Sequence, residues 1–397
     1  MPEHFPFARR TGWAFNSNKL IARLDEFKKA GVPFLDLTES NPCRCGFRYP
    51  AEDILSALKD TENLSYNPSA QGLPEARRAV CGYYREKGID VRPEQVFLTA
   101  STSESYSLLF RLFLNTGERV LIPSPSYPLF DLLAQINDVV IDQYPLRYDH
   151  RWSVDTNVLA RSIQKTTRAI ILVHPNNPTG SFIDRQELGD IIQIARKNKL
   201  VIICDEVFSD YVRDKGDVLP SVLGNKEVPV FVLSGISKIL GLPQMKLGWI
   251  IVDGPPEMVA DALPRLEIIS DTYLSVNTPA QNALPAWLKL RKDIQAEITG
   301  RLSRNLECLK GCIRGVPGLK SLDSQGGWYS VLRLPDGINE EEWIFGLLDE
   351  EHVFVHPGYL FDFPEEPYIV LSLLTPPEAL AEGAEKIVRR LIRTKAS

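Results

Sequence analysis

Residues Leu233–Trp249 read LSGISKILGLPQMKLGW. A short apolar run ends in a turn of small residues that presents Lys238, and a second apolar run, LGWIIV, follows. Continuous apolar runs bounded by turn residues predict strands that are covered on both faces. A lysine at the end of a strand is usually just solvated. The residues that follow the other strands therefore decide whether Lys238 has a chemical role.

The centre of the chain alternates between apolar runs and longer stretches of mixed polarity that are typical of helices. The runs cover residues 96–100, 119–125, 168–175, 200–207, 229–235 and 247–254. This alternation predicts an α/β fold with a central, mostly parallel sheet flanked by helices. After about residue 278, long helical stretches and short strands predict a smaller α+β part. We expect a large α/β domain over 43–285 and a small α+β domain over 1–42 and 286–397.

Composition narrows the classes of partner. The 397 residues carry a net charge of −6, which gives no broadly basic surface for nucleic acid. No apolar stretch approaches the roughly 20 residues that span a bilayer, and MPEHFPFARR lacks a signal-peptide core. We therefore expect a cytoplasmic protein that binds neither nucleic acid nor membrane. The six cysteines show no paired ligand spacing, so we expect no metal site.

Chemically capable side chains follow five of the apolar runs. Because carboxyl ends of parallel strands meet at one edge of a sheet, we expect these side chains to share a site. They are Ser101, Thr102, Ser103, Tyr127, Asn177, Asp205 and Lys238. The glycine-rich patterns of dinucleotide and triphosphate sites are absent from the sequence.

These groups match the needs of pyridoxal 5′-phosphate. A lysine amine can form an imine with an aldehyde, and a carboxylate can keep a ring nitrogen protonated. A flat aromatic can cover the ring, and a Ser/Thr-rich turn at the start of a helix suits one phosphate.

The sequence resembles the class I/II aminotransferases, a fold-type-I group of pyridoxal-phosphate enzymes, over nearly its whole length. The family pattern SxSKxxxxPGxRxGW is similar to SGISKILGLPQMKLGW, which implies that Lys238 holds the cofactor as an aldimine, with Ser237 beside it. CDEVFSDY places Asp205 at the pyridinium nitrogen, and NNPTG places Asn177 at the phenolic oxygen of the ring. PSPSYPLF places Tyr127 on the ring face.

The resemblance also implies a phosphate site and a homodimer. The turn Ser101–Thr102–Ser103 matches the family's phosphate loop. Tyr66, in SYNPSAQGLPEAR, resembles the tyrosine that reaches the phosphate of the partner subunit.

Three departures from the family pattern concern the cofactor. Lys246 stands where an arginine is expected, which keeps the charge but loses the two-pronged geometry. Gly235 replaces a frequent hydroxyl donor. Phe208 replaces a tyrosine that donates to the phenolate, and loss of that donor makes the phenolate more basic.

A fourth departure concerns the substrate. The family's carboxylate-binding arginine in a YxRLS-like strand corresponds to Val370 in PYIVLSLL, and no arginine or lysine lies between Arg333 and Lys386. Ser40, in the SNP turn, is expected to line the same pocket. Arg333, Arg44 and Arg48 are candidates for another carboxylate ligand, and Tyr273 stands where dicarboxylate-specific relatives carry an arginine.

We interpret the chain as an aminotransferase that moves an amino group from an amine or amino acid to a keto acid or other carbonyl acceptor. The unusual pocket leaves open a simple amine, a modified amino acid, or a donor gripped differently. Lyase, decarboxylase, racemase or cyclising chemistry on the same fold is an alternative. A non-enzymatic protein that binds ligands on this scaffold is a third reading.

Overall fold

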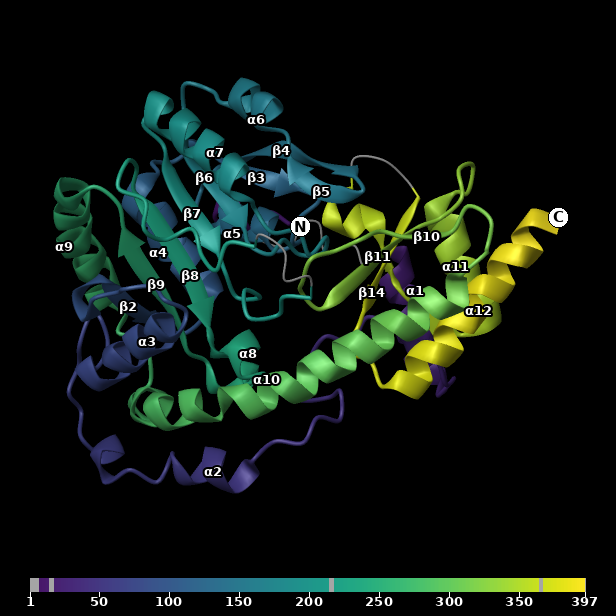
Figure 1. Ribbon diagram of the computed structural model, residues 1–397, viewed down its shortest axis with the longest axis horizontal. Coiled ribbons are helices and arrows are strands. Elements are labelled where there is room, and N and C mark those ends of the chain that lie inside the picture. The colour runs from purple at the N-terminus through teal and green to yellow at the C-terminus, as the bar shows by residue number, and fades with distance from the viewer. Residues whose placement is uncertain (1–6, 14–17, 214–217, 364–366, 397) are drawn as a thin grey trace, which may run out of the picture.

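The computed structural model describes residues 7–13, 18–213, 218–363 and 367–396. Its largest feature is an eight-stranded sheet with the order β2-β9-β8-β7-β6-β3-β4-β5, at the centre left of Figure 1. The strands are β2 (Val96–Thr99), β3 (Arg119–Ser124), β4 (Val140–Asp149), β5 (Arg151–Val154), β6 (Thr167–Val173), β7 (Val201–Asp205), β8 (Val230–Gly235) and β9 (Gly248–Asp253).

All six predicted strands lie in this sheet, and the predicted α/β class is confirmed. Strands β3, β4, β6, β7 and β8 pair in parallel, whereas β9 is antiparallel to both of its neighbours, β2 and β8. The strands β2, β3, β6, β7 and β8 therefore share one direction, and their carboxyl ends lie at one edge. The antiparallel β4–β5 hairpin was not predicted, because β4 is a partly exposed strand without a continuous apolar run.

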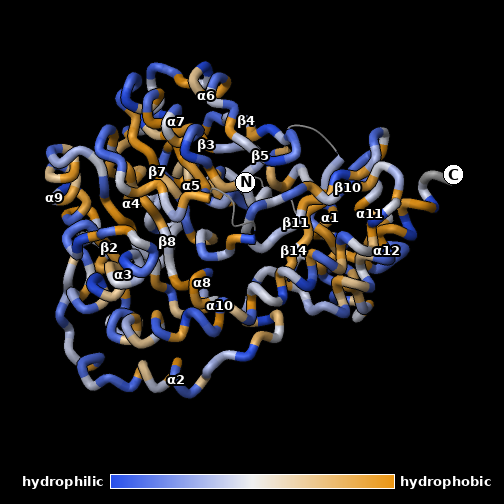
Figure 2. The backbone as a smooth tube through the Cα atoms, in the orientation of Figure 1, coloured by the Kyte–Doolittle hydropathy of each residue, from blue (hydrophilic) through white to orange (hydrophobic). Residues whose placement is uncertain are grey.

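The core forms on both faces of the sheet, as continuous apolar strands require. Successive residues of β7 alternate between two buried clusters: Ile202 and Cys204 belong to one, and Val201 and Ile203 to the other. Figure 2 shows hydrophobic segments concentrated in the sheet and hydrophilic ones on the outer helices and loops. The sheet is therefore a rigid platform whose polar groups are confined to strand ends.

Helices cover both faces and extend into the C-terminal part. They are α1 (Lys19–Ala30), α2 (Ala51–Ser56), α3 (Pro74–Glu86), α4 (Thr102–Phe113), α5 (Phe130–Ile136), α6 (Thr156–Ser162), α7 (Arg185–Asn198), α8 (Ile236–Ile239), α9 (Pro256–Tyr273), α10 (Thr278–Ile313), α11 (Glu340–Glu351) and α12 (Pro377–Ala396). Within the described residues, no helix combines the length and apolar character that crossing a membrane requires.

A smaller antiparallel sheet occupies the C-terminal part. Its order is β10-β11-β14-β13, with β10 (Lys320–Ser321), β11 (Tyr329–Arg333), β13 (His356–Pro357) and β14 (Tyr368–Ser372). Beside it, β1 (Leu35–Asp36) pairs in parallel with β12 (Val353–Phe354). Helix α1 packs here, since Phe27 makes an edge contact with His352 at 5.5 Å between ring centroids.

Helix α10 links the two regions, running from the large sheet to the small one in Figure 1. The predicted boundary between residues 285 and 286 falls inside this helix. The division of the chain into domains over 43–285 and over 1–42 with 286–397 stays a prediction.

Candidate active site

Asp205 and Lys238 come from neighbouring strands of the large sheet. Asp205 is the last residue of β7 and lies opposite Leu233 of the parallel strand β8. Lys238 follows in α8, the short helix that begins directly after β8. Burial lowers the pKa of Lys238, and the nearby Asp205 carboxylate opposes that shift. The two groups are thus close enough to influence each other's charge.

The Asp205 carboxylate is half-buried and held by two donors. The backbone N–H of Val207 donates to Oδ1 at 3.1 Å, and the hydroxyl of Tyr106 donates to Oδ2 at 3.2 Å. Burial raises the pKa of Asp205 to about 6, although both donors and Lys238 favour the charged form. An additional cation at this carboxylate would favour ionisation further.

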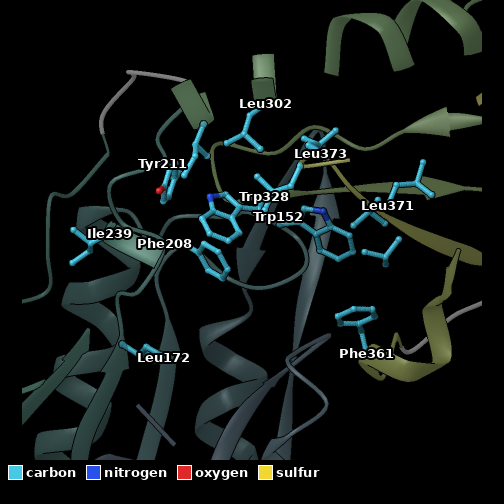
Figure 3. Packing of buried hydrophobic residues seen from close by; sticks show 14 of the residues in the cluster. Trp152, Leu172, Phe208, Tyr211, Ile239, Leu302, Trp328, Phe361, Leu371 and Leu373 are labelled. Carbon is cyan, nitrogen blue, oxygen red and sulfur yellow. The ribbon is translucent and has the colours of Figure 1, made fainter. Parts of the chain in front are cut away.

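The Lys238 amine lies beside a pair of packed aromatic rings. Its Nζ is 5.4 Å from the ring centroid of Phe208 and 5.0 Å from that of Trp328. Figure 3 shows these two rings side by side, with Tyr211 above them. The Tyr211 hydroxyl donates to the Lys238 carbonyl at 2.6 Å, which anchors α8. Burial against these rings lowers the pKa of Lys238, which increases the share of nucleophilic free amine.

The loops after β3 and β6 are tied together. Asn176 donates from Nδ2 to the Pro125 carbonyl at 3.3 Å, and Thr179 donates from Oγ1 to Asn176 Oδ1 at 2.9 Å. This network positions two predicted residues. Asn177 is buried, and its Oδ1 has no hydrogen-bond partner among the described residues. Burial raises the pKa of Tyr127, and the negative charge of Asp205 raises it further. Tyr127 therefore lies close enough to Asp205 to sense its charge.

The predicted phosphate loop begins α4. Ser101 caps the helix by accepting from the Glu104 N–H at 3.2 Å, and Thr102 and Ser103 form its first turn. The first N–H groups of a helix lack partners within the helix and attract anions. The loop adjoins β9, since a Cβ at Gly248 would lie 3.4 Å from the Ser101 carbonyl carbon.

Gly235 is required by the backbone around it. A Cβ at this position would meet Gly248 Cα at 2.9 Å and the Leu247 carbonyl oxygen at 3.0 Å. The hydroxyl residue of the family pattern would force β8 and β9 apart. Ser237, in α8, precedes Lys238 and is half-buried.

The substrate side of the site comes from the small sheet and the SNP turn. Tyr329 of β11 lies within hydrogen-bonding reach of Ser40 and near Tyr127, and burial raises its pKa to about 12. Its ring centroid is 6.5 Å from that of Phe208. Val370 is fully buried in β14, opposite Val331. Ser40 therefore lies beside Tyr329 at the site, whereas Val370 lies in the core of the small sheet, one row from Tyr329 on the same face.

The candidate arginines have other partners. Arg333 Nη2 pairs with Asp336 Oδ1 at 3.0 Å, and Arg44 Nη1 lies 3.8 Å from Glu39 Oε2. Arg48 is exposed. Arg333 shares a sheet face with Val370 but stands one row farther from Tyr329.

Two other predicted residues lie on the surface. Lys246 is exposed, at the end of a 3₁₀ turn (Pro243–Met245) just before β9. Tyr66 is 82 % exposed and lines a cavity of about 50 Å³ together with Glu104 and Tyr273. Within the described part of the chain, no cluster of three or more His, Cys, Asp or Glu side chains could hold a metal ion.

Comparison with known proteins identifies the family. Residues 32–387 match the family described as aminotransferase class I and II. The chain belongs to this family. Glutamate-pyruvate aminotransferase AlaA of Haemophilus influenzae is 26% identical over 382 residues, with 94% of each chain covered. Tyrosine aminotransferase of Dictyostelium discoideum is 26% identical over 391 residues, covering 94% of this chain and 93% of that protein.

Solved aminotransferases share the fold. Alanine aminotransferase from Pyrococcus furiosus superposes with a TM-score of 0.89 at 26% identity, covering 98% of this chain and 100% of that one. An aminotransferase from Escherichia coli gives a TM-score of 0.87 at 23% identity, covering 98% of both chains. The protein is therefore a pyridoxal-phosphate-dependent aminotransferase, as the sequence predicted.

The residues present fit this cofactor. The buried Asn177 amide has no hydrogen-bond partner for Oδ1 among the described residues, and the turned amide would present the donor Nδ2 at that point instead. Beside it the site offers an amine, a carboxylate, an exposed aromatic face and a helix N-terminus, which are the groups that pyridoxal phosphate needs.

Sequence reasoning missed three residues of the site: Tyr106, Trp328 and Tyr329. Tyr106 lies in α4, 99 residues before its partner Asp205. Tyr329 begins β11 of the small sheet, and Trp328 directly precedes that strand. The pair Gly326–Gly327 was the available signal for the last two. A Cβ at Gly326 would meet the Tyr211 carbonyl oxygen at 2.4 Å, so this loop packs directly against the segment after Asp205.

Proposed function

We propose that this aminotransferase holds its cofactor through Lys238 and accepts a donor whose α-substituent is not bound by an arginine. The observation that carries the assignment of Lys238 is the placement of its half-buried amine, packed against Phe208 and Trp328, beside the Asp205 carboxylate. When bound, pyridoxal phosphate supplies an electron sink for the bond that breaks at the donor's α-carbon. Its aldehyde carbon would attach to Lys238 Nζ.

The protein's own groups then have distinct tasks. Asp205, fixed by Val207 and Tyr106, would hold a ring nitrogen in its protonated form. The free amine of Lys238 would take the proton from the donor's α-carbon as a general base. Trp328 and Phe208 pack against this amine.

The remaining predicted contacts complete the binding site. Asn177 Nδ2 would donate to the phenolic oxygen, and Tyr127 would cover the ring face. Ser101, Thr102, Ser103, Ser237 and Lys246 would hold the phosphate.

The proposal that no arginine binds the donor's α-substituent rests on Val370. An arginine–carboxylate pair is bidentate and charge-assisted, and leaving a buried charge without its partner costs about 3–5 kcal/mol. Val370 is fully buried and offers no such partner. The donors that fit are a simple amine, a modified amino acid, or an amino acid gripped by other groups.

We also infer a homodimer that resides in the cytoplasm. Large apolar side chains are exposed in the region of Tyr66, and exposed patches of this kind mark interfaces. They are Leu64, Tyr66, Ile268 and Tyr273, which are 91%, 82%, 70% and 52% exposed. Sedimentation of the purified protein as a monomer at micromolar concentration would contradict the dimer.

Two experiments test the proposal. Borohydride reduction of the cofactor-loaded protein, followed by peptide mapping, is expected to place the cofactor's mass on the peptide that contains Lys238. Mass on another lysine, or a colourless loaded protein, would overturn this assignment. Val370→Arg is then compared with wild type on alanine, glutamate and alkyl or aryl amines. We expect wild type to favour the amines and the variant to gain activity on alanine. Efficient use of α-amino acids by wild type, with a weaker variant, would refute the apolar pocket.

A further inference from the structure

A histidine occupies the sheet position beside Val370. His356 of β13 is directly opposite Val370 of β14, and Val331 of β11 is opposite Val370 on the other side. Directly opposed residues in antiparallel strands point to the same face, so these three side chains form one row. Tyr329 lies on the same face, one row closer to Lys238.

An aromatic ring links His356 to the site. The ring centroid of buried Phe361 is 5.6 Å from that of His356 and 6.5 Å from that of Tyr329. Figure 3 shows Phe361 below Trp328 and Phe208. Phe361 therefore bridges His356 to Tyr329, the residue within reach of Ser40, while Val370 flanks His356 in the sheet.

The chemistry of His356 suits a neutral partner. Its Nδ1 is buried without a hydrogen-bond partner among the described residues, and burial lowers its pKa to about 4. At neutral pH the imidazole is thus uncharged, with one ring nitrogen donating and the other accepting. The nearest charge acting on it is the Asp36 carboxylate, which would repel a second carboxylate. The cation Arg333 lies one row beyond Val370 and is held by Asp336.

We propose that His356 is a specificity-determining residue that hydrogen-bonds a neutral polar group on the donor's α-carbon. The substrates are then α-substituted amines that carry a carboxamide or hydroxymethyl group where ordinary amino acids carry a carboxylate. This inference rests on the aminotransferase function proposed above. It explains why the apolar Val370 and the unpaired Nδ1 of His356 stand side by side in the sheet.

A matched series of donors tests this inference. L-Alanine, L-alaninamide, L-alaninol and 2-aminobutane differ only in the group that would face His356. Wild type, His356→Phe and His356→Gln are compared by kcat/KM, with His150→Phe as a control at an exposed histidine. Binding is measured separately, as the rise in the thermal midpoint of the loaded protein with isobutyramide or isobutyrate, which lack the reacting amine.

We expect wild type to have a higher kcat/KM for L-alaninamide and L-alaninol than for the other donors. In His356→Phe, kcat/KM for these two should fall at least about tenfold, whereas kcat/KM for 2-aminobutane should stay within about twofold of wild type. His356→Gln should retain part of the preference, and isobutyramide should stabilise wild type but not His356→Phe. A uniform loss on all four donors, or a preference for alanine that His356→Phe leaves intact, would overturn the inference. If no donor converts the cofactor while isobutyramide still stabilises only wild type, the proposed transfer fails and the His356 contact stands.

Discussion

The ring of Phe208 lies 5.4 Å from the amine of Lys238 and packs edge-on against Trp328, at 5.2 Å between centroids. A phenylalanine here cannot donate a hydrogen bond, whereas the family's tyrosine can. The side chain at position 208 therefore affects both the burial of the Lys238 amine and the basicity of the cofactor's phenolic oxygen.

Phe208→Tyr is expected to lower the pH at which the bound cofactor changes its visible absorbance. A new O–H donor to the phenolate stabilises the anionic form, so a proton leaves at lower pH. The midpoint of a spectrophotometric pH titration measures this shift, with Phe208→Leu as a variant that adds no donor. Coinciding midpoints for wild type and Phe208→Tyr would refute the argument.

Asp205→Asn is expected to reduce kcat by about 10²–10³-fold, as removal of one preorganised electrostatic group does in other enzymes. The amide keeps the shape of the carboxylate but cannot balance a positive ring nitrogen. Tyr106→Phe is the matched control, because it removes only the 3.2 Å hydrogen bond to Oδ2 and should cost far less. Equal losses in the two variants would show that position, rather than charge, is what Asp205 supplies.

Local sequence was sufficient for the framework of the site. Lys238, Asp205, Asn177 and Tyr127 follow apolar runs, and the parallel direction of those strands places their ends at one edge. The apolar runs and the expected parallel direction of the strands together predicted that arrangement, although the catalytic and binding roles stay predictions.

Tertiary packing determined what the sequence did not reveal. Trp328 reaches Lys238 only because the small sheet folds over the edge of the large one, and His356 reaches Val370 only through the register of β13 on β14. No local pattern encodes such contacts. Gly235 shows the same limit, since its need for a missing Cβ depends on Gly248 in the neighbouring strand.

Lys246→Arg is expected to tighten cofactor binding by about tenfold, because a charged hydrogen bond contributes about 1.5–3 kcal/mol and the guanidinium offers a second one to phosphate. The backbone at Lys246 is left-handed, with φ at 51°, and both side chains meet that constraint equally. Equilibrium titration of the cofactor-free protein measures the dissociation constant. Lys246→Gln should bind more weakly than wild type, and an arginine variant no tighter than wild type would exclude a phosphate contact.

His174 makes the stability of the protein sensitive to acid. Its Nε2 hydrogen-bonds the Leu219 carbonyl at 2.9 Å, and its Nδ1 accepts from the Ile183 N–H at 3.1 Å, so the buried ring is neutral. Burial lowers its pKa from 6.5 to about 4. The folded state thus binds a proton less readily than the unfolded state, and the contribution of His174 is complete above pH 6.5 and is lost as the pH falls to about 4.

The size of this pKa shift corresponds to about 3 kcal/mol in the free energy of unfolding. Urea unfolding of wild type and His174→Gln between pH 7 and pH 4 measures it, and we expect the stability gap between them to narrow by that amount as the pH falls. His150→Gln is the control, since His150 is fully exposed and should leave the slope unchanged. Burial raises the pKa of Asp205 to about 6 and that of Glu206 to about 7, so these two groups add stability as the pH falls. Both are present in wild type and in His174→Gln, and their effect therefore cancels in the stability difference between the two proteins. Parallel curves for wild type and His174→Gln would show that the ring is not the acid-sensitive group.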